Sequence, residues 1–358
     1  MEQITNAVPR RDWETADGGT VRFALIGMGW WTSEKVLPAL EETELATATV
    51  AVSSSASKAE RFVDDWESLE RGITYDEFHD GAATDAYDAV YICTPNALHL
   101  PYAETAAELG KAVLCEKPME ATLERAERLR AACAEADVPL IVGYRMQTEP
   151  VVRHARELVR DGVIGDPVFV HGNNSQPVLE LIPDPDQWRL DPELSGYGTS
   201  VMDLGIYTLN TARFVLDAEP VRAQAMADSS HEAFEDVPDQ RASFSVELDD
   251  GTPLTGTTSQ HAHSDSLLRI VGTEGTVVLD PAFHMNAVLH VDHPGGSVTV
   301  DAADVDQMTE IFAYAADRLL SGAAIEPDGT DGVVDMATLA AIYEAAETGD
   351  SVAVERTE

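Results

Sequence analysis

The order of the predicted elements indicates an α/β protein with two domains. In residues 21–143, apolar runs of strand length alternate with helical segments across short turns, a pattern typical of a doubly wound parallel sheet. Residues 144–358 contain several alternating strand-like runs between 221 and 291, which predicts an α+β domain with a large, mostly antiparallel open sheet. The length of 358 residues is sufficient for two such cores, and residues 1–20 form a polar arm before them.

The composition is strongly acidic along the whole chain. There are 64 acidic and 23 basic residues, which gives a net charge of −41, and only four of the basic residues are lysines. This composition indicates a halophilic host, because at molar salt the Debye length falls to ~3 Å and the self-repulsion of such a surface is screened. An ordinary acidic cytoplasmic protein is the competing interpretation. The charge excludes nucleic acid as a partner, since phosphate binding needs a basic face.

The sequence also indicates a cytoplasmic protein without a membrane partner. No apolar run reaches the ~18 residues expected of a membrane span. Arg10-Arg11 is followed by Asp12-Trp13-Glu14 rather than by the apolar core of an export signal. The three cysteines (Cys93, Cys115 and Cys133) are odd in number, and two stand in strand-like runs, so we expect reduced structural thiols.

A glycine turn follows the first predicted strand, 21–26. The segment Gly27-Met28-Gly29-Trp30-Trp31 joins this strand to a helix expected to begin near Thr32. This is the required context of a dinucleotide site, because the glycines permit a tight turn close to the pyrophosphate and the free helix amides meet its charge. A purely structural glycine turn is the alternative, since Thr32 stands where the fingerprint has a third glycine or alanine.

The second predicted strand, 46–52, ends in a serine-rich segment. A site for NAD would place an acidic residue there to bind the ribose 2′-hydroxyl, whereas this chain has Ser53-Ser54-Ser55-Ala56-Ser57-Lys58. Hydroxyl groups and an ammonium group suit a 2′-phosphate, so we expect NADP as the cofactor, with Ser53, Ser54 and Lys58 at the phosphate. The competing interpretation is a solvated turn with Lys58 on a helix surface.

Two further strand ends carry polar residues that can flank a nicotinamide. One apolar strand leads into Thr94-Pro95-Asn96 and His99, and the next ends in Glu116-Lys117-Pro118. Pro118 cannot continue a central strand and disfavours helix at Lys117. The lysine is therefore held at the carboxyl end of a strand, where open α/β sheets bind their ligands.

The second domain contains a predicted helix, 200–214, with a polar stripe on an apolar background. Asp203, Tyr207 and Asn210 are spaced i, i+4 and i+7, so they share one helix face. Buried polar groups need partners, and this face belongs either to an active site or to a core in which an aspartate satisfies the tyrosine. An irregular polar loop, 173–199, precedes the helix.

His261 and His263 form a His-x-His pair on one predicted strand. A zinc site would need at least one further ligand, and no third ligand pattern accompanies the pair. We therefore interpret them as surface histidines and expect no metal.

At these residues the sequence resembles the Gfo/Idh/MocA family, which includes glucose–fructose oxidoreductase and inositol dehydrogenase. The resemblance covers nearly all of residues 21–350 and rests on six motifs in the same order. They are Gly27-Met28-Gly29, Thr94-Pro95-Asn96 with His99, Glu116-Lys117-Pro118, Gly143-Tyr144-Arg145, Gln187-Trp188-Arg189-Leu190 and the segment 203–210. Tyr207 and the Gln-Trp-Arg-Leu segment are most similar to the aldose-oxidising, NADP-dependent branch of haloarchaeal type, since inositol dehydrogenases carry histidine in place of the tyrosine.

The resemblance implies a Rossmann domain for the cofactor and a C-terminal domain whose open sheet forms homodimers or tetramers. It implies Lys117 and Tyr207 as the catalytic pair and Asp203 as a residue that binds or orients the substrate. Further residues implied in this way are Tyr144, Trp188, Arg189 and Asn210 in the sugar pocket, and Arg145 at the sugar or the cofactor.

The expected activity is oxidation of a cyclic aldose, with D-xylose favoured, at C1 to the aldonolactone by hydride transfer to NADP, as a step of pentose catabolism. Tyr207 would remove the proton of the C1 hydroxyl, and the ammonium of Lys117 would favour the ionised form of a side chain that ordinarily titrates near pH ~10. The alternatives are oxidation of an inositol or another polyol, reduction of a keto-sugar and, from a different class, a non-catalytic NADP-binding regulator.

Overall fold

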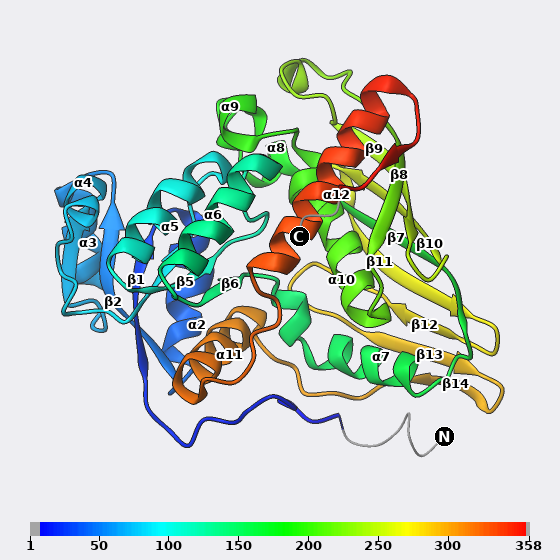
Figure 1. The fold of residues 1–358 in the computed structure, drawn as a ribbon, viewed down its shortest axis with the longest axis horizontal. Coiled ribbons are helices and arrows are strands. Elements are labelled where there is room, and N and C mark those ends of the chain that lie inside the picture. The colour runs from blue at the N-terminus through cyan, green and yellow to red at the C-terminus, as the bar shows by residue number, and fades with distance from the viewer. Residues whose placement is uncertain (1–7, 356–358) are drawn as a thin grey trace. The chain divides into compact units, whose positions relative to one another are not determined.

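The computed structural model describes residues 8–355, and this chain divides into two compact units, whose elements are labelled in Figure 1. The nucleotide unit comprises residues 13–145 and 306–333, and the sheet unit comprises residues 8–12, 146–305 and 334–355. The contiguous division expected from the sequence differs from this one, because 306–333 and residues 13–20 of the arm belong to the nucleotide unit. Residues 1–7 of the expected arm lie outside the described residues.

The nucleotide unit is built on a six-stranded parallel sheet, as the alternating pattern of the sequence predicts. Its strands are β1 (Val21–Ile26), β2 (Ala46–Ser53), β3 (Arg71–Thr74), β4 (Ala89–Ile92), β5 (Ala112–Cys115) and β6 (Leu140–Val142). Their order is β3-β2-β1-β4-β5-β6, and every neighbouring pair is parallel. The direction of winding reverses between β1 and β4, where doubly wound sheets bind ligands beyond the carboxyl ends of their strands.

Helices connect these strands on both faces of the sheet. They are η1 (Thr32–Val36, a π-helix), α2 (Leu37–Glu41), α3 (Ala56–Asp65), α4 (Tyr75–His79), η2 (Asn96–Leu98), α5 (His99–Glu108), α6 (Leu123–Glu135) and α11 (Gln307–Ser321). The hydroxyls of Ser55, Thr74 and Thr122 each accept a hydrogen bond from a first-turn amide of α3, α4 and α6, which fixes where those helices begin. The helix expected near Thr32 begins two residues earlier, at Trp30, and becomes a π-helix over Thr32–Val36.

Helix α11 belongs to the nucleotide unit although it lies near the end of the sequence. Its Phe312 packs edge-on against Phe23 of β1 and Tyr91 of β4, with ring centroids 5.2 and 5.0 Å apart. The buried carboxylate of Asp317 accepts a hydrogen bond from the backbone amide of Thr15 at 2.7 Å, which fastens residues of the arm to this helix. An apolar helix face does not identify the sheet that it covers, so the sequence pattern could not assign α11 to the first domain.

The sheet unit contains a nine-stranded sheet in the order β14-β13-β12-β11-β7-β10-β9-β8-β15. Its strands are β7 (Pro167–Pro177), β8 (Pro220–Asp228), β9 (Arg241–Leu248), β10 (Pro253–Ser259), β11 (His261–Gly272), β12 (Thr276–Leu279), β13 (Leu289–His293), β14 (Gly296–Thr299) and β15 (Val352–Ala353). Only the pair β7–β10 is parallel among these strands of the described chain. Buried and exposed residues alternate along β9 and β10, so one face of the sheet is packed and the other is open, as the sequence predicts.

The sheet unit also contains helices. They are η3 (Arg145–Thr148), α7 (Pro150–Arg160), α8 (Val178–Leu181), η4 (Trp188–Leu190), α9 (Pro192–Ser195), η5 (Val201–Gly205, a π-helix), α10 (Ile206–Leu216), η6 (Glu232–Phe234) and α12 (Gly329–Thr348), which begins in the nucleotide unit. Within the sheet unit α10 contacts α7 and β7, and Figure 1 shows α10 and α7 beside the strands.

Two sequence-based expectations for this region are corrected. The segment expected as an irregular loop, 173–199, begins as strand, because β7 continues to Pro177 in its pairing with β10 and β11, and it then carries three short helices. The helix expected over 200–214 is present and runs without a break from Ser200 to Leu216, but it is not a regular α-helix, because Val201–Gly205 form a π-helix before α10. A π turn holds more residues than an α turn, so the spacing between Asp203 and the residues of α10 is not that of a regular helix.

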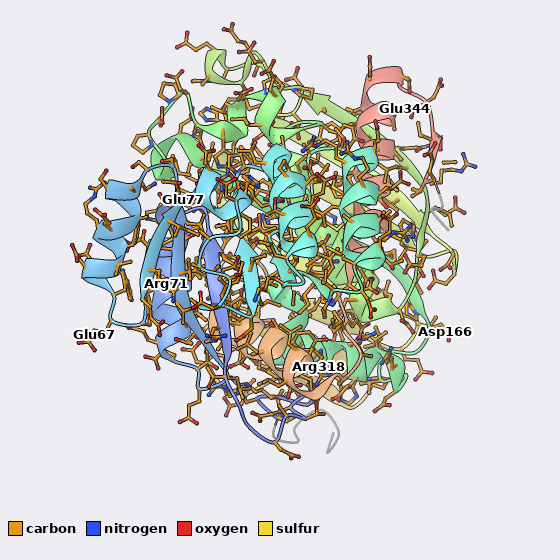
Figure 2. The ribbon with its side chains drawn as sticks, turned by 60° about the vertical axis from the view of Figure 1, so that its left-hand side comes forward. Glu67, Arg71, Glu77, Asp166, Arg318 and Glu344 are labelled. Atoms are coloured by element: carbon orange, nitrogen blue, oxygen red, sulfur yellow. The ribbon has the colours of Figure 1, made fainter. Side chains whose placement is uncertain are left out.

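The acidic residues are distributed over the surfaces of both units. Figure 2 labels four exposed carboxylates, Glu67 and Glu77 of the nucleotide unit and Asp166 and Glu344 of the sheet unit. The three cysteines are free thiols, and burial raises the pKa of Cys133 to about 12. Across residues 8–355, no helix combines the length and the apolar character that crossing a membrane requires.

Candidate active site

The predicted site residues fall into two groups. Most residues predicted to bind the cofactor, called the cofactor half below, lie in the nucleotide unit at the carboxyl ends of β1, β2, β4 and β5. Most residues predicted to bind the sugar, called the substrate half below, lie in the sheet unit on or near η5 and α10.

In the cofactor half, the glycine turn after β1 requires its first glycine. Gly27 has a φ of +99°, and a Cβ atom there would lie 2.2 Å from the carbonyl oxygen of Cys93. The buried hydroxyl of Thr32 donates to the carbonyl of Gly27 at 2.6 Å and closes the turn. Thr32 departs from the glycine fingerprint, but its hydroxyl makes a hydrogen bond to Gly27 that a third glycine could not make. At Gly29 the space is open, with nothing within 4 Å of a built Cβ atom.

The end of β2 offers hydroxyl groups at the predicted phosphate position. Ser53 is fully buried, and its hydroxyl has no hydrogen-bond partner among residues 8–355. Ser54 is exposed, and Ser55 caps α3 by accepting a hydrogen bond from the amide of Lys58 at 3.4 Å. A buried hydroxyl without a partner is costly. A phosphate oxygen would satisfy Ser53, so this end of the sheet fits a 2′-phosphate.

Glu116 fixes the turn that carries Lys117. The hydroxyl of Tyr91 donates to Oε1 of Glu116 at 2.7 Å, and the backbone amide of Lys117 donates to Oε2 at 3.1 Å. Burial, reinforced by the charges of Cys93 and Glu116, raises the pKa of Tyr91 well above its usual value, so this tyrosine remains a hydrogen-bond donor. Glu116 thus positions the lysine through its backbone. Tyr91 was not predicted from the sequence, where the only sign of this contact is a tyrosine hydroxyl in an otherwise aliphatic strand.

His99 connects the turns that follow β4 and β5. Its ring is fully buried, with Nδ1 3.2 Å from the carbonyl oxygen of Met119 and Nε2 3.0 Å from that of Thr94. A second bridge lies beside it: buried Glu120 accepts two hydrogen bonds from Arg125, which also donates to the carbonyl of Ala97 at 2.7 Å. His99 therefore holds the loop predicted to flank the nicotinamide.

In the substrate half, Asp203 lies within η5 and is bound to Arg189. Oδ2 of Asp203 accepts hydrogen bonds from Nε of Arg189 and from Nε2 of Gln260, each at 2.9 Å. The guanidinium of Arg189 in turn lies 4.5 Å from the ring centroid of Trp188. Three residues that the sequence predicts for the sugar pocket are therefore in one cluster, together with Gln260, which the sequence analysis did not identify.

A buried aspartate anchors the start of η5. Asp239 accepts hydrogen bonds from the amides of Thr199 and Val201 at 2.6 and 2.7 Å and from the hydroxyl of Tyr343 at 2.6 Å. Burial raises the pKa of Asp239 to about 6, although these hydrogen bonds act in the opposite direction. A Cβ atom at Gly198 would lie 2.4 Å from the Asp239 carboxylate, which explains why glycine precedes the helix.

Tyr207 is partly exposed at the start of α10. Its ring centroid lies 5.7 Å from that of Phe283, and the amide of Phe283 donates to the hydroxyl of Ser266 at 3.2 Å. Nearby in the chain, Nε2 of His284 lies 3.0 Å from Oδ1 of Asn174. Phe283 is a contact of the predicted catalytic tyrosine that had no signal in the sequence, because it lies 76 positions further along the chain.

Asn210 lies in a different environment from Asp203 and Tyr207. It is buried and donates from Nδ2 to Asp335 at 2.7 Å, while its Oδ1 accepts from Gln147 at 3.0 Å. Asp335 is also bound to Arg213. The predicted polar stripe therefore divides, with Asn210 in an internal network of the sheet unit.

The remaining predicted residues are Tyr144 and Arg145 in the nucleotide unit. Both are buried, and Arg145 donates to the side-chain oxygen of Gln307, the first residue of α11. In the sheet unit, His261 and His263 are exposed, and the ring of His261 lies 4.7 Å from that of His231. No group of three or more histidine, cysteine, aspartate or glutamate residues suited to a metal ion occurs in the described part of the chain.

Two family models match the sequence. Residues 21–144 match the oxidoreductase family with an NAD-binding Rossmann fold (GFO_IDH_MocA), and residues 152–278 match the GFO/IDH/MocA C-terminal domain. Among solved structures, the fold is similar to that of the aldose-aldose oxidoreductase from Caulobacter crescentus complexed with glycerol. The TM-score is 0.87 at 29% sequence identity, over 94% of this chain and 100% of that chain.

Curated relatives match over nearly their full length. The chain is 52% identical to D-xylose 1-dehydrogenase (NADP(+)) of Haloarcula marismortui, over 98% of this chain and 99% of the relative. It is 31% identical to D-xylose 1-dehydrogenase (NADP(+)) 2 of Haloferax volcanii, over 92% of this chain and 98% of the relative. It is also 28% identical to 1,5-anhydro-D-fructose reductase of Ensifer adhaerens, over 93% of this chain and 98% of the relative.

Proposed function

Because the chain belongs to the GFO/IDH/MocA oxidoreductase family, we propose that it is an NADP-dependent sugar dehydrogenase. It oxidises a cyclic aldose, D-xylose in the first place, at C1 to the aldonolactone. The observation that supports this most strongly is the 52% identity, over 98% of the chain, to the NADP-dependent D-xylose 1-dehydrogenase. The proposed role is a step of pentose catabolism in the cytoplasm.

NADP fits the residues of the cofactor half. The pyrophosphate would lie at the glycine turn, the 2′-phosphate at the end of β2, and the nicotinamide beside the ends of β4 and β5. When bound, the cofactor supplies the hydride acceptor. The proposed contacts are Gly27, Met28, Gly29, Trp30 and Trp31 for the pyrophosphate; Ser53, Ser54 and Lys58 for the 2′-phosphate; and Thr94, Pro95, Asn96, Glu116, Lys117 and Arg145 for the nicotinamide side. His99 holds the loop of this last group through its two backbone contacts.

We assign the proton transfer to Tyr207 and Lys117. Loss of a hydride from C1 requires removal of the proton on the C1 hydroxyl, and Tyr207 acts as the base. Lys117 takes part in the same transfer by hydrogen-bonding the hydroxyl that loses the proton. Glu116 supports this role because it fixes the lysine backbone. Asp203 binds a hydroxyl of the sugar, with Trp188 and Arg189 beside it.

The proposed assembly is a homodimer or homotetramer formed through the open face of the nine-stranded sheet. Large apolar side chains are exposed on its strands: Phe169 on β7 is 44% exposed, and Met226 on β8 is 75% exposed. Large apolar side chains exposed on the open face of a sheet favour an interface between subunits there.

The test is a substrate panel. Purified protein is mixed with NADP and with aldoses, inositols and other polyols at molar KCl, and formation of NADPH is followed by its near-ultraviolet absorbance; keto-sugars are tested with NADPH in the reverse direction. We expect D-xylose to give the highest kcat/KM. The similarity to 1,5-anhydro-D-fructose reductase makes keto-sugar reduction the second candidate, and turnover only with keto-sugars would select it. Binding of NADP without turnover of any sugar would indicate the non-catalytic regulator.

The same assay tests the adaptation to salt that the net charge of −41 predicts. In dilute buffer, the repulsion between unscreened carboxylates destabilises the folded chain. We expect activity and far-ultraviolet circular dichroism to be lost together as the salt is removed. Full activity in dilute buffer, without gain from added KCl, would contradict the prediction.

A further inference from the structure

Gln260, which lies between β10 and β11, is held from several directions by its backbone. It is fully buried. Its amide donates to the carbonyl of Gln240 at 3.1 Å and to the hydroxyl of Ser200 at 3.0 Å, and its carbonyl accepts from the amide of Val178 at 2.9 Å. Ser200 immediately precedes η5, so these contacts fix Gln260 relative to the helix that carries Asp203.

The side chain of Gln260 is oriented by a second glutamine. Oε1 of Gln260 accepts a hydrogen bond from Nε2 of Gln176 at 2.8 Å, and Nε2 of Gln260 donates to Oδ2 of Asp203 at 2.9 Å. A glutamine amide has one accepting end and one donating end. Since Gln176 presents a donor, the accepting end of Gln260 faces Gln176, and its donating end faces Asp203.

Oδ2 of Asp203 therefore receives donors from two different elements. Arg189, on η4, donates from Nε, and Gln260 donates from the end of β10. Arg189 is partly exposed on a short 3₁₀ helix, whereas Gln260 is fully buried at the junction of two strands of the sheet. Of the two donors, Gln260 is the one that the rigid scaffold fixes.

We propose that Gln260, oriented by Gln176, is a positioning residue that holds the Asp203 carboxylate in the orientation that binds substrate. The inference rests on the proposed function in one respect, the assignment of Asp203 to the sugar. It adds two residues that act through Asp203 and that no sequence motif identifies. Residue 260 must be neutral and must donate a hydrogen bond, because an acceptor atom in the position of Nε2 would face a carboxylate oxygen of Asp203.

An isosteric charge substitution tests this inference. In Gln260→Glu, the new carboxylate faces Asp203, and two adjacent carboxylates cannot both remain ionised at low cost. We expect the KM for the sugar to rise about tenfold or more at neutral pH, with the Kd for NADP unchanged, because a charge-assisted hydrogen bond is replaced by repulsion. As the pH falls and the pair shares one proton, the hydrogen bond is restored, so KM should recover toward the wild-type value measured at the same pH.

Gln240→Glu is the matched control. Gln240 is also buried, but its Oε1 accepts hydrogen bonds from the amides of Ser230 and His231, which a carboxylate preserves. This variant adds the same charge without facing Asp203, so its KM should stay within about twofold of wild type. Gln176→Met, which removes the donor that orients Gln260, should raise KM in the same direction by a smaller factor.

Crystal structures of wild type and Gln260→Glu at neutral pH provide a readout that does not depend on turnover. We expect the Asp203 carboxylate to rotate away from position 260 in the variant. An unchanged Asp203 rotamer, or a wild-type KM with an unchanged pH profile in the folded variant, would overturn the inference. If wild type oxidises no sugar, the proposed function fails by itself, and the Asp203 rotamer still decides whether Gln260 positions that side chain.

Discussion

The contacts that hold predicted site residues span short separations along the chain in the cofactor half and long separations in the substrate half. In the cofactor half, the hydroxyl of Thr32 binds the carbonyl of Gly27, five residues before it, and Glu116 binds the amide of its own neighbour, Lys117. In the substrate half, Asp203 is bound by Gln260, which is 57 residues away in the chain.

The anchors behind the substrate half are more distant still. Asp239 binds Thr199 across 40 residues and Tyr343 across 104, and Asn210 binds Asp335 across 125. Both halves carry sequence motifs, but the difference shows why the partners that hold Asp203 and Asn210 lie outside those motifs. A turn closed by near neighbours leaves a fixed spacing in the sequence, whereas a carboxylate held by remote strands and helices leaves none.

The largest expected effect comes from removing one proposed catalytic side chain from each half. Lys117→Met and Tyr207→Phe should each lower kcat by about 10²–10⁴ while NADP still binds, because each removes a group that handles the proton. Steady-state kinetics and NADP titration by fluorescence measure both quantities. Lys35→Met, which removes an equal charge from η1, is the control and should retain its kcat.

The double variant shows whether the two halves act as one catalytic unit. Residues that act together are strongly non-additive, so Lys117→Met/Tyr207→Phe should be scarcely slower than the worse single variant. Near-normal turnover of either single variant would contradict the assignment of Lys117 and Tyr207 as the catalytic pair. Fully additive losses would show that the two side chains act independently.

A smaller effect is expected where the cofactor half selects its nucleotide. Ser53→Asp and the exposed Ser54→Asp should each lower the ratio of kcat/KM for NADP over NAD at least about tenfold, because a carboxylate beside a phosphate is repelled. Ser68→Asp adds the same charge in the turn before β3, at the opposite end of that strand from the carboxyl ends, so it serves as the control. An unchanged NADP preference in both serine variants would contradict the assignment of the 2′-phosphate site.

Asp239, the long-range anchor of the substrate half, should make a measurable contribution to the free energy of unfolding. Asp239→Asn presents an amide group where the carboxylate accepts from two backbone amides, and one unsatisfied buried amide costs about 1–3 kcal/mol. Chemical denaturation at neutral pH measures this loss of unfolding free energy. Asp236→Asn, an exposed position in the same segment, should change it little.

The same pair of proteins tests the titration of Asp239. Burial raises its pKa from 3.8 in the unfolded reference to about 6, so between these values the folded state binds more protons than the unfolded state. Its contribution to stability is therefore complete below pH ~4 and decreases as the pH rises through about 6. The stability difference between wild type and Asp239→Asn should widen as the pH falls through this window. A difference that is constant with pH would contradict the raised pKa.

The smallest effect is expected for a local contact of the cofactor half. Thr32→Val removes the hydroxyl that binds the Gly27 carbonyl and should lower the unfolding free energy by about 1 kcal/mol. Thr47→Val, on a partly buried side of β2, is the control. A loss at Thr32 larger than that at Asp239 would reverse the comparison between short-range and long-range anchors.

The fold class, the parallel sheet and the glycine turn could be predicted from the sequence, because strand periodicity, turn residues and helix caps act over a few neighbouring positions. The edge strand β3 (Arg71–Thr74) had no such signal. The sequence also identified the serine-rich end of β2 and the position of Lys117 at a strand end. These features follow from backbone restrictions of glycine and proline and from the charge of single side chains.

The contacts between segments that are distant in the sequence are known from the three-dimensional structure alone. The structure assigned α11 to the nucleotide unit through Phe312, separated Asn210 from the polar stripe through Asp335, and placed Gln260 on Asp203. None of these pairings follows from a local pattern, because an apolar face or a buried amide specifies that it needs a partner but not which one. The start of the helix that carries Asp203 is likewise held from a distance, since Asp239 binds the amides of Thr199 and Val201.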